Sequence, residues 1–157
     1  MATGTPATKL LNSAGVDFVE HEYDHDPKSA SFGLEAAEKL GVDPSRVFKT
    51  LIANLDETYA VAIVPVNKQV SLKSLSRTLG AKRATMADPA QAARLTGYVV
   101  GGISPLGQKR LLPTVIDATA NDFETILVSG GRRGFDIELS PKDLANLLSA
   151  VFAEIAS

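Results

Sequence analysis

The chain has 157 residues, 45% of them hydrophobic, which is enough for the core of one domain. Its formal net charge of −2 excludes the overall basic field of many nucleic-acid-binding proteins, so any RNA contact must come from local patches. The absence of cysteine excludes disulfides, thiolate metal sites and a cysteine nucleophile.

The segment 1–10 is polar and small-residue-rich, without the apolar stretch of a signal peptide, and no apolar run approaches the length of a membrane span. We therefore expect a cytoplasmic protein that has no membrane partner.

Hydrophobic periodicity, helix-capping residues and glycine stops divide the chain into alternating helices and strands. In chain order we expect a helix at 6–14, a strand at 16–21, a helix at 32–40, strands at 47–55 and 59–66, helices at 72–79 and 89–96, strands at 114–118, 124–128 and 135–139, a helix at 141–150 and a short strand at 151–153. The three-residue interval between 47–55 and 59–66 predicts a hairpin, which argues against a purely parallel sheet. The pattern predicts a mixed α/β (α+β) fold in which residues 1–157 form one domain.

Lys49 lies inside an apolar strand, Val47–Ala53, and a buried ammonium group costs several kcal/mol unless it is compensated. The lysine either extends its tip to the surface or works in a pocket.

The glycine-rich segment Gly101–Gly107 has neither the Walker lysine nor the G-x-G-x-x-G spacing, so it is not a nucleotide-binding loop of either kind. It is either an ordinary loop or a backbone cradle. In the second case Gly101 and Gly102 bring main-chain N–H groups close to a ligand, and Pro105 stiffens the loop.

Asp136 alternates with apolar residues in its strand, so it lies either on a solvated face with Glu138 or in a pocket, where it holds an amino group or pairs with Lys49. Tyr23 and Phe32 are candidate aromatic walls. His21 and His25 lie in one polar loop with no distant ligand to complete a metal site or a catalytic triad, so we expect no metal.

Basic residues form three local groups, which are either ordinary charged surface or contacts to phosphates. The groups are Lys68, Lys73, Arg77, Lys82 and Arg83; then Lys109 and Arg110; and finally Arg132 and Arg133.

Several motifs occur together in a fixed order along the chain. They are Tyr23, Phe32, Lys49-Thr50-Leu51, Met86-Ala87-Asp88-Pro89, Thr96-Gly97-Tyr98, the block from Gly101 to Gln108 and the block from Ser129 to Leu139. With these motifs the chain closely resembles the YbaK family of bacterial Cys-tRNA(Pro) deacylases, from about Pro6 to Ala153. That family is a free-standing relative of the editing domain inserted in bacterial prolyl-tRNA synthetases.

The resemblance implies a curled, barrel-like mixed β-sheet surrounded by helices, and an aminoacyl-tRNA hydrolase that removes cysteine mischarged on tRNA(Pro). It implies that the cysteine thiol attacks its own ester carbonyl and leaves as a thiolactone, so that the protein mainly positions the substrate. No cofactor is implied, and the implied partners are the aminoacyl-tRNA and prolyl-tRNA synthetase.

The implied catalytic group comprises Lys49 near the carbonyl or ribose, Gly101 and Gly102 orienting the ester, and Asp136 on the α-amino group. The implied substrate-binding residues are Tyr23, Phe32, Thr50, Ile103, Ser104, Pro105 and Ser129. Phosphate contacts are expected from Lys109, Arg110, Arg132 and Arg133.

Three alternatives remain: an Ala-tRNA(Pro) deacylase of the same superfamily, a non-catalytic tRNA- and synthetase-binding module, and a hydrolase of small cysteine or S-linked metabolites. The first relatives look to use a late histidine, and this chain has none after His25. The retention of Lys49 and Asp136 argues against the second.

Overall fold

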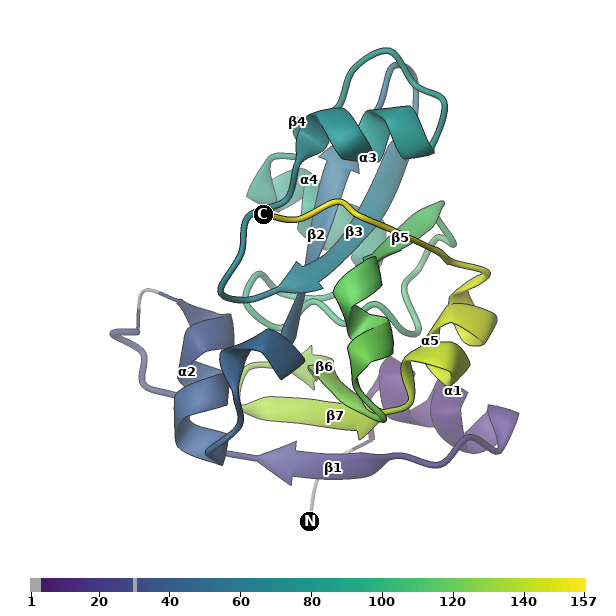
Figure 1. Cartoon of the computed structure of the whole chain (residues 1–157). Coiled ribbons are helices and arrows are strands. Elements are labelled where there is room, and N and C mark those ends of the chain that lie inside the picture. Colours follow the sequence, from purple (N-terminus) through teal and green to yellow (C-terminus); the bar gives the residue numbers. More distant parts are fainter. Residues whose placement is uncertain (1–3, 30) are drawn as a thin grey trace.

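A computed structural model describes residues 4–29 and 31–157. Across these residues the chain forms five α-helices, two 3-10 turns and eight strands, divided between two sheets (Figure 1). The helices are α1 (Pro6–Ala14), α2 (Phe32–Leu40), α3 (Leu72–Thr78), α4 (Pro89–Thr96) and α5 (Pro141–Leu148). The 3-10 turns are η1 (Pro44–Arg46) and η2 (Ala118–Asp122). The strands are β1 (Val19–Glu22), β2 (Phe48–Asn54), β3 (Tyr59–Pro65), β4 (Thr85–Met86), β5 (Thr114–Asp117), β6 (Ile126–Arg132), β7 (Phe135–Leu139) and β8 (Val151–Ala153).

The helix ends follow the capping residues in the sequence. The side chains of Ser31, Ser71, Asp88 and Ser140 accept hydrogen bonds from main-chain N–H groups of the first turns of α2, α3, α4 and α5. Left-handed glycines end α1, α2 and α4, as predicted. Helix α5 is shorter than predicted, because Ser149 adopts φ 52° and turns the chain before Ala150.

The larger sheet has the order β4-β2-β3-β5-β8, and the smaller one β1-β7-β6. The predicted hairpin is the antiparallel pair β2–β3, whereas β3–β5 and β5–β8 are parallel, so the mixed fold is confirmed. In Figure 1 β2 begins near the smaller sheet and runs up into the larger one, with α2 on one side and α1 and α5 on the other.

The predicted barrel-like closure is wrong, because the described residues form two open sheets. A single parallel bridge, Val47–Leu127, joins the start of β2 to β6, and the two strands then diverge. Beyond that bridge β2 is paired on its outer edge only at its far end, where Ala53 and Asn54 meet Met86 and Thr85 of β4.

The main apolar core fills the space between the sheets and the helices. Its largest members, fully buried, include Phe48 of β2, Phe135 of β7 and Ile116 of β5. Strand β3 is buried along nearly its whole length, which explains its continuous apolar sequence.

Thr5, just before α1, and Pro6, its first residue, contact two glycine-rich segments that lie far away in the sequence. The Thr5 Oγ1 hydroxyl donates to the Gly130 carbonyl at 2.6 Å, and a Cβ on Gly107 would lie 2.6 Å from the Pro6 backbone. Tyr98, whose hydroxyl donates to the Leu106 carbonyl, lies against Gly131. Helix α1 therefore fixes the glycine-rich segments around 101–107 and 130–134.

We predict that Asp117→Ala lowers the free energy of unfolding by about 2 to 3 kcal/mol, because it leaves a buried main-chain N–H unpaired and removes a cap. The carboxylate is 2% exposed and accepts from Ile155 N at 3.0 Å and from Thr119 N at 3.3 Å. Urea denaturation measures the loss. The control is Asp122→Ala, an exposed position where the change is within about 0.5 kcal/mol. Equal losses in both variants would contradict the role of Asp117.

Candidate active site

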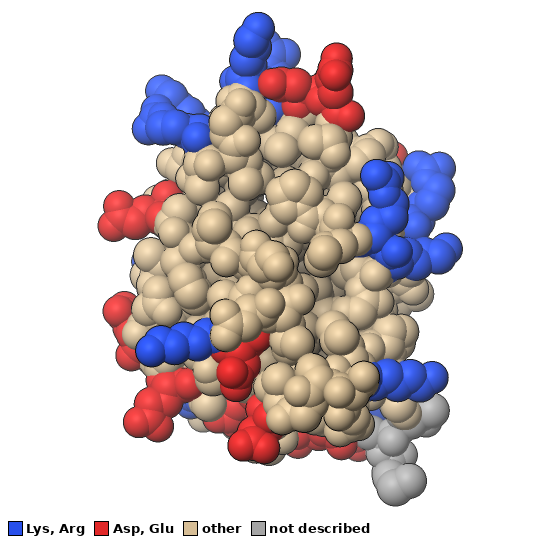
Figure 2. Space-filling model, turned by 90° about the vertical axis from the view of Figure 1, so that its right-hand side faces the viewer, with Lys and Arg blue, Asp and Glu red and all other residues tan. Residues whose placement is uncertain are grey.

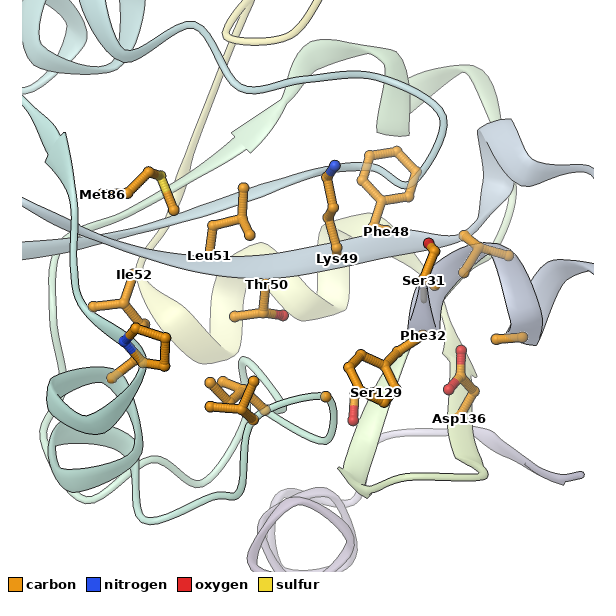
Figure 3. A pocket seen from close by; sticks show the side chains of 18 of the residues that line it. Ser31, Phe32, Phe48, Lys49, Thr50, Leu51, Ile52, Met86, Ser129 and Asp136 are labelled. Carbon is orange, nitrogen blue, oxygen red and sulfur yellow. The ribbon is translucent and has the colours of Figure 1, made fainter. Parts of the chain in front are cut away.

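The gap that opens between β2 and β6 holds a cavity of about 360 Å³. Segments from β2, β6, β7, α2, α4 and the loop after α4 contribute to its wall (Figure 3). The lining residues are Tyr23, Ser31, Phe32, Gly33, Ala36, Val47, Phe48, Lys49, Thr50, Leu51, Ile52, Met86, Ala87, Pro89, Ala92, Val100, Gly101, Ile103, Ser129 and Asp136. The cavity thus collects eight of the residues expected from the sequence: Tyr23, Phe32, Lys49, Thr50, Gly101, Ile103, Ser129 and Asp136.

Val47 and the first five residues of β2, 48–52, line the cavity, so the strand presents its edge to it. The main-chain bonds Val66 N to Val47 O and Leu55 N to Thr58 O show that the odd-numbered residues of β2 bond to β3. Main-chain groups alternate in direction along an antiparallel strand, so Thr50 directs its N–H and C=O to the opposite, open edge. The bond from Ala87 N to Ile52 O, on that same edge, agrees with this alternation.

The Thr50 side chain adds a third polar group to this wall. Its Oγ1 is buried and has no hydrogen-bond partner among the described residues. A buried hydroxyl left without a partner is costly, so Thr50 is suited to bond with a ligand in the cavity.

Lys49 and Asp136 line the same cavity but do not pair. Figure 3 shows Lys49 and Leu51 pointing to one side of β2, and Thr50 and Ile52 pointing to the other side, on which Ser129 lies. No ion pair within 4.0 Å involves Lys49 or Asp136 in the described part of the chain, which corrects the suggested pairing. Burial alone lowers the pKa of Lys49.

Asp136 is 6% exposed, and its carboxyl faces the cavity rather than solvent. Desolvation raises its pKa from 3.8 to about 7. Burial and, second, the charge of Asp136 raise the pKa of the neighbouring Tyr23 to about 12, so Tyr23 stays protonated at neutral pH. Glu138, two residues further, lies outside the cavity, where it bonds to His21, Arg46 and Thr125. The site therefore holds one buried acid available for a cationic ligand.

The glycine-rich loop begins with a tight turn over Val99–Gly102. Gly102 N donates to Val99 O at 2.9 Å, and Gly101, at the third position, has φ +88°. These features are typical of a type II turn. The Gly102 N–H is thus used inside the loop, and only Gly101 of the two glycines lines the cavity.

Apart from Ile103, which lines the cavity, the remaining loop residues hold the shape of the loop. A Cβ on Gly102 would lie 2.8 Å from the Arg132 Cα, so the loop packs directly on the backbone of β6. Ser104 is fully buried, and its Oγ accepts from Leu106 N, while the Gln108 side chain donates to the Ser104 carbonyl. Pro105 is also buried.

Phe32 is held between two charged or polar side chains at the start of α2. Its ring centroid lies 5.5 Å from that of His25, and the Arg133 guanidinium carbon lies 5.0 Å from it on the ring face. His25 Nδ1 in turn bonds to Glu35 Oε1 at 2.7 Å. Desolvation would raise the pKa of Glu35, but the hydrogen bonds from this imidazole and from Asp26 N outweigh it, so the pKa is lowered. The contacts with His25 and Arg133 therefore hold the Phe32 ring, one of the two predicted aromatic walls, in place.

The four basic residues predicted to contact phosphates lie outside the cavity. Lys109 and Arg110 are exposed. Arg132 pairs with Glu22 at 2.7 Å and lies 4.7 Å over the Phe135 ring. Arg133 donates to the Val100 carbonyl.

The apolar residues that make up much of the cavity wall have no property in the sequence that predicts a role in the site. Met86, Ala87 and Pro89 belong to a motif quoted above, but nothing in their chemistry separates them from core residues. Strand β4, which places Met86 beside Ala53, is too short for a periodic signal.

We predict that Asp136→Asn changes the pH dependence of stability. The native pKa of about 7 exceeds the ordinary 3.8, so the folded protein binds an extra proton between these values. The wild-type unfolding free energy should therefore fall, relative to the variant, as pH rises from about 4 to 7, by up to roughly 1.4 kcal/mol per pH unit. Urea denaturation across this range tests it, with exposed Asp122→Asn as the control. Parallel curves for wild type and Asp136→Asn would show that the carboxyl titrates normally.

Comparisons with known proteins identify the family of the chain. A profile of the aminoacyl-tRNA editing domain matches residues 27–147. The chain is 35% identical over 156 residues to an Enterococcus faecalis protein named "Putative Cys-tRNA(Pro)/Cys-tRNA(Cys) deacylase EbsC", covering 98% of this chain and 93% of that one. It is 25% identical over 142 residues to the proline–tRNA ligase of Lactobacillus helveticus, covering 86% of this chain but 25% of the ligase.

Among solved structures, one described as a "putative trans-editing enzyme for prolyl tRNA synthetase" superposes with a TM-score of 0.83. It is 23% identical and covers 99% of both chains, so it shares the fold. The profile matches most of the chain, and the 35% identity to the Enterococcus faecalis protein extends over nearly its full length. The chain therefore belongs to the aminoacyl-tRNA editing domain family.

Proposed function

We propose that residues 1–157 form one editing domain that deacylates tRNA(Pro) mischarged with cysteine. The observation that carries this proposal is a cavity equipped to position a ligand, with a buried carboxyl, an open strand edge and a loop amide. The 35% identity with a protein named for this activity supports the choice of substrate.

The described lining of the cavity has no serine, threonine or cysteine paired with a histidine base. That described lining contains no histidine or cysteine, and the two histidines of the chain bond to Glu138 and Glu35 instead. Ser129 Oγ accepts from Gly131 N at 3.2 Å, with no histidine among the lining residues to activate it. A nucleophile supplied by the substrate removes the need for one in the protein.

In the proposed reaction the cysteine thiol attacks its own ester carbonyl. A C–S bond forms, the C–O bond to the terminal ribose breaks, and the thiol proton ends on the ribose oxygen. The products are the thiolactone and tRNA with a free terminal hydroxyl. The protein contributes by holding thiol and carbonyl in the reactive geometry and by stabilising the developing oxyanion.

Each site residue then has a proposed role. Asp136 would hold the α-amino group, because a buried carboxylate gains most from a cationic partner. Gly101 would donate to the ester carbonyl. Lys49, pointing away from Ser129, would lie near the ribose or the terminal phosphate.

The substrate pocket would be shaped by the other lining residues of the predicted set, Tyr23, Phe32, Thr50, Ile103 and Ser129. Gly102, Ser104 and Pro105 would act indirectly by fixing the loop. The small cavity suits a small aminoacyl group, where an editing site supplies discrimination that a synthetase pocket of similar size cannot.

The proposed partners are the aminoacyl-tRNA and prolyl-tRNA synthetase, and the proposed location is the cytoplasm. No helix within the described residues is long and apolar enough to cross a membrane.

The experiment compares deacylation of Cys-tRNA(Pro), Ala-tRNA(Pro) and Ser-tRNA and traps the released product. We expect rapid release of cysteine as the thiolactone, with alanine and serine spared, because only cysteine carries the thiol. Release of alanine would indicate the sister activity instead. If none of the three aminoacyl-tRNAs is deacylated, the result would favour a non-catalytic binding module.

Lys49→Ala is the matched test of the site, and we expect it to abolish deacylation while the circular dichroism spectrum and melting temperature are retained. The control is Lys142→Ala, an exposed lysine on α5 that leaves activity unchanged. Wild-type activity in a folded Lys49→Ala protein would refute the proposed role of Lys49.

Contact with the tRNA backbone is proposed for the exposed Lys109 and Arg110. Arg132, which was predicted from the sequence to contact phosphates too, keeps the same proposed role. Figure 2 shows one face on which charged side chains stand around an uncharged centre, with basic ones mainly along the top and the right and acidic ones mainly at the lower left. This distribution favours local contacts over a general basic field.

We predict that the double substitution Lys109→Ala, Arg110→Ala weakens tRNA binding and reduces its salt dependence by roughly 0.7 to 0.9 in log–log slope per lost phosphate contact. Filter binding over a salt series measures both quantities. The double substitution Lys9→Ala, Lys142→Ala removes equal charge from other exposed positions and serves as the control. Equal effects of the two double variants would show that only total charge matters.

A further inference from the structure

The turn at Val99–Gly102 leaves one peptide group free. Its internal bond joins Gly102 N to Val99 O, so it uses neither the carbonyl nor the N–H of the central Val100–Gly101 peptide. In a trans peptide these two groups point in opposite directions. Whatever fixes the Val100 carbonyl therefore also fixes the direction of the Gly101 N–H.

Arg133 holds that carbonyl with two donors. Its Nε donates to Val100 O at 2.9 Å and its Nη2 at 2.6 Å. The guanidinium is planar and rigid, so two of its N–H groups on one oxygen set the orientation of the carbonyl more tightly than a single donor does.

The same guanidinium lies against the aromatic wall of the cavity. Its carbon is 5.0 Å from the Phe32 ring centroid, and a Cβ on Gly101 would lie 2.9 Å from both Arg133 Nε and the Phe32 ring. Three separate segments, the glycine-rich loop, the β6–β7 turn and the start of α2, meet at this side chain. The absence of a side chain at Gly101 is what allows the contact.

The Gly101 N–H points away from Arg133 and is available for a ligand. Gly101 lines the cavity, and its N–H donates to no main-chain or side-chain acceptor found in residues 4–29 and 31–157. A cation on the carbonyl oxygen of a peptide polarises that peptide and strengthens its N–H as a donor.

We propose that Arg133 is a positioning residue that aims the Gly101 N–H at the reacting ester carbonyl. This inference rests on the proposed deacylase function and replaces the phosphate contact predicted for Arg133 from the sequence. It assigns Arg133 an effect on the chemical step and Lys109 and Arg110 an effect on binding.

The test compares Arg133→Ala and Arg133→Lys with Arg94→Ala, a control that removes an exposed arginine of α4. Single-turnover deacylation at saturating enzyme gives the rate of the chemical step, and filter binding gives the Kd for tRNA. We expect both Arg133 variants to react about tenfold or more slowly, with Kd within about twofold of wild type, as for loss of an aimed donor. Lysine fails because its ammonium lacks the planar fork.

Added guanidinium should restore part of the rate of Arg133→Ala and none of the rate lost by Arg133→Lys. A weakened Kd with an unchanged saturated rate would overturn the proposal and return Arg133 to the tRNA contacts. Wild-type rates in both variants would overturn it as well.

A second measurement keeps this inference separate from the proposed reaction. Hydrogen exchange of the Gly102 amide, which donates to Val99 O, should accelerate in Arg133→Ala and stay unchanged in Arg94→Ala, whether or not any aminoacyl-tRNA is turned over. Unchanged exchange would show that Arg133 does not hold the loop. Accelerated exchange in a protein inactive on every substrate would refute the deacylase proposal and leave the positioning of the loop by Arg133 intact.

Discussion

The separation of β2 from β6 after their single bridge is the constraint on which the rest of the site depends. A strand that continued to pair with β6 would close the sheet and fill the space that the cavity occupies. Because pairing stops after Val47–Leu127 and resumes only with β4, the Thr50 main-chain groups remain open between the two ends. An open edge is ordinarily a liability for aggregation, and here the surrounding loop and helices cover it.

The cavity combines groups that hold a ligand with few groups that could react with it. Among the described residues, Asp136 is buried without a cationic partner, and the Thr50 hydroxyl and the Gly101 amide have no hydrogen-bond partner. Each of these is unfavourable in the empty protein and becomes favourable when a complementary ligand binds. Such an arrangement suits catalysis by placement, in which binding energy orients a substrate that already carries its nucleophile.

The sequence predicted most helices and strands, because caps, glycine stops and apolar periodicity are local signals. It also identified Lys49, Gly101 and Asp136 as special, since a charge in an apolar strand or a glycine pair stands out. It misjudged closure of the sheet, which depends on where two distant strands separate. It could not predict the bond from Arg133 to the Val100 carbonyl, because a solvated arginine and one that donates to a carbonyl look the same in a sequence. Met86 and Ala87 belong to a motif of the resemblance, but their chemistry predicted no role in the site, because an apolar wall is chemically identical to a core.

The contacts that Thr5 and Pro6 make at the start of α1 bear on where the functional unit ends. The family profile spans residues 27–147, but Thr5 and Pro6, outside it, hold the backbone of Gly130 and Gly107. Strands β1 and β8 also fall outside that span while pairing with β7 and β5. A fragment trimmed to the recognisable family boundaries would keep every cavity-lining residue except Tyr23 and still lose the supports that give the loops their shape. Modular transfer of this editing unit into another protein thus requires its flanking segments as well as its motifs.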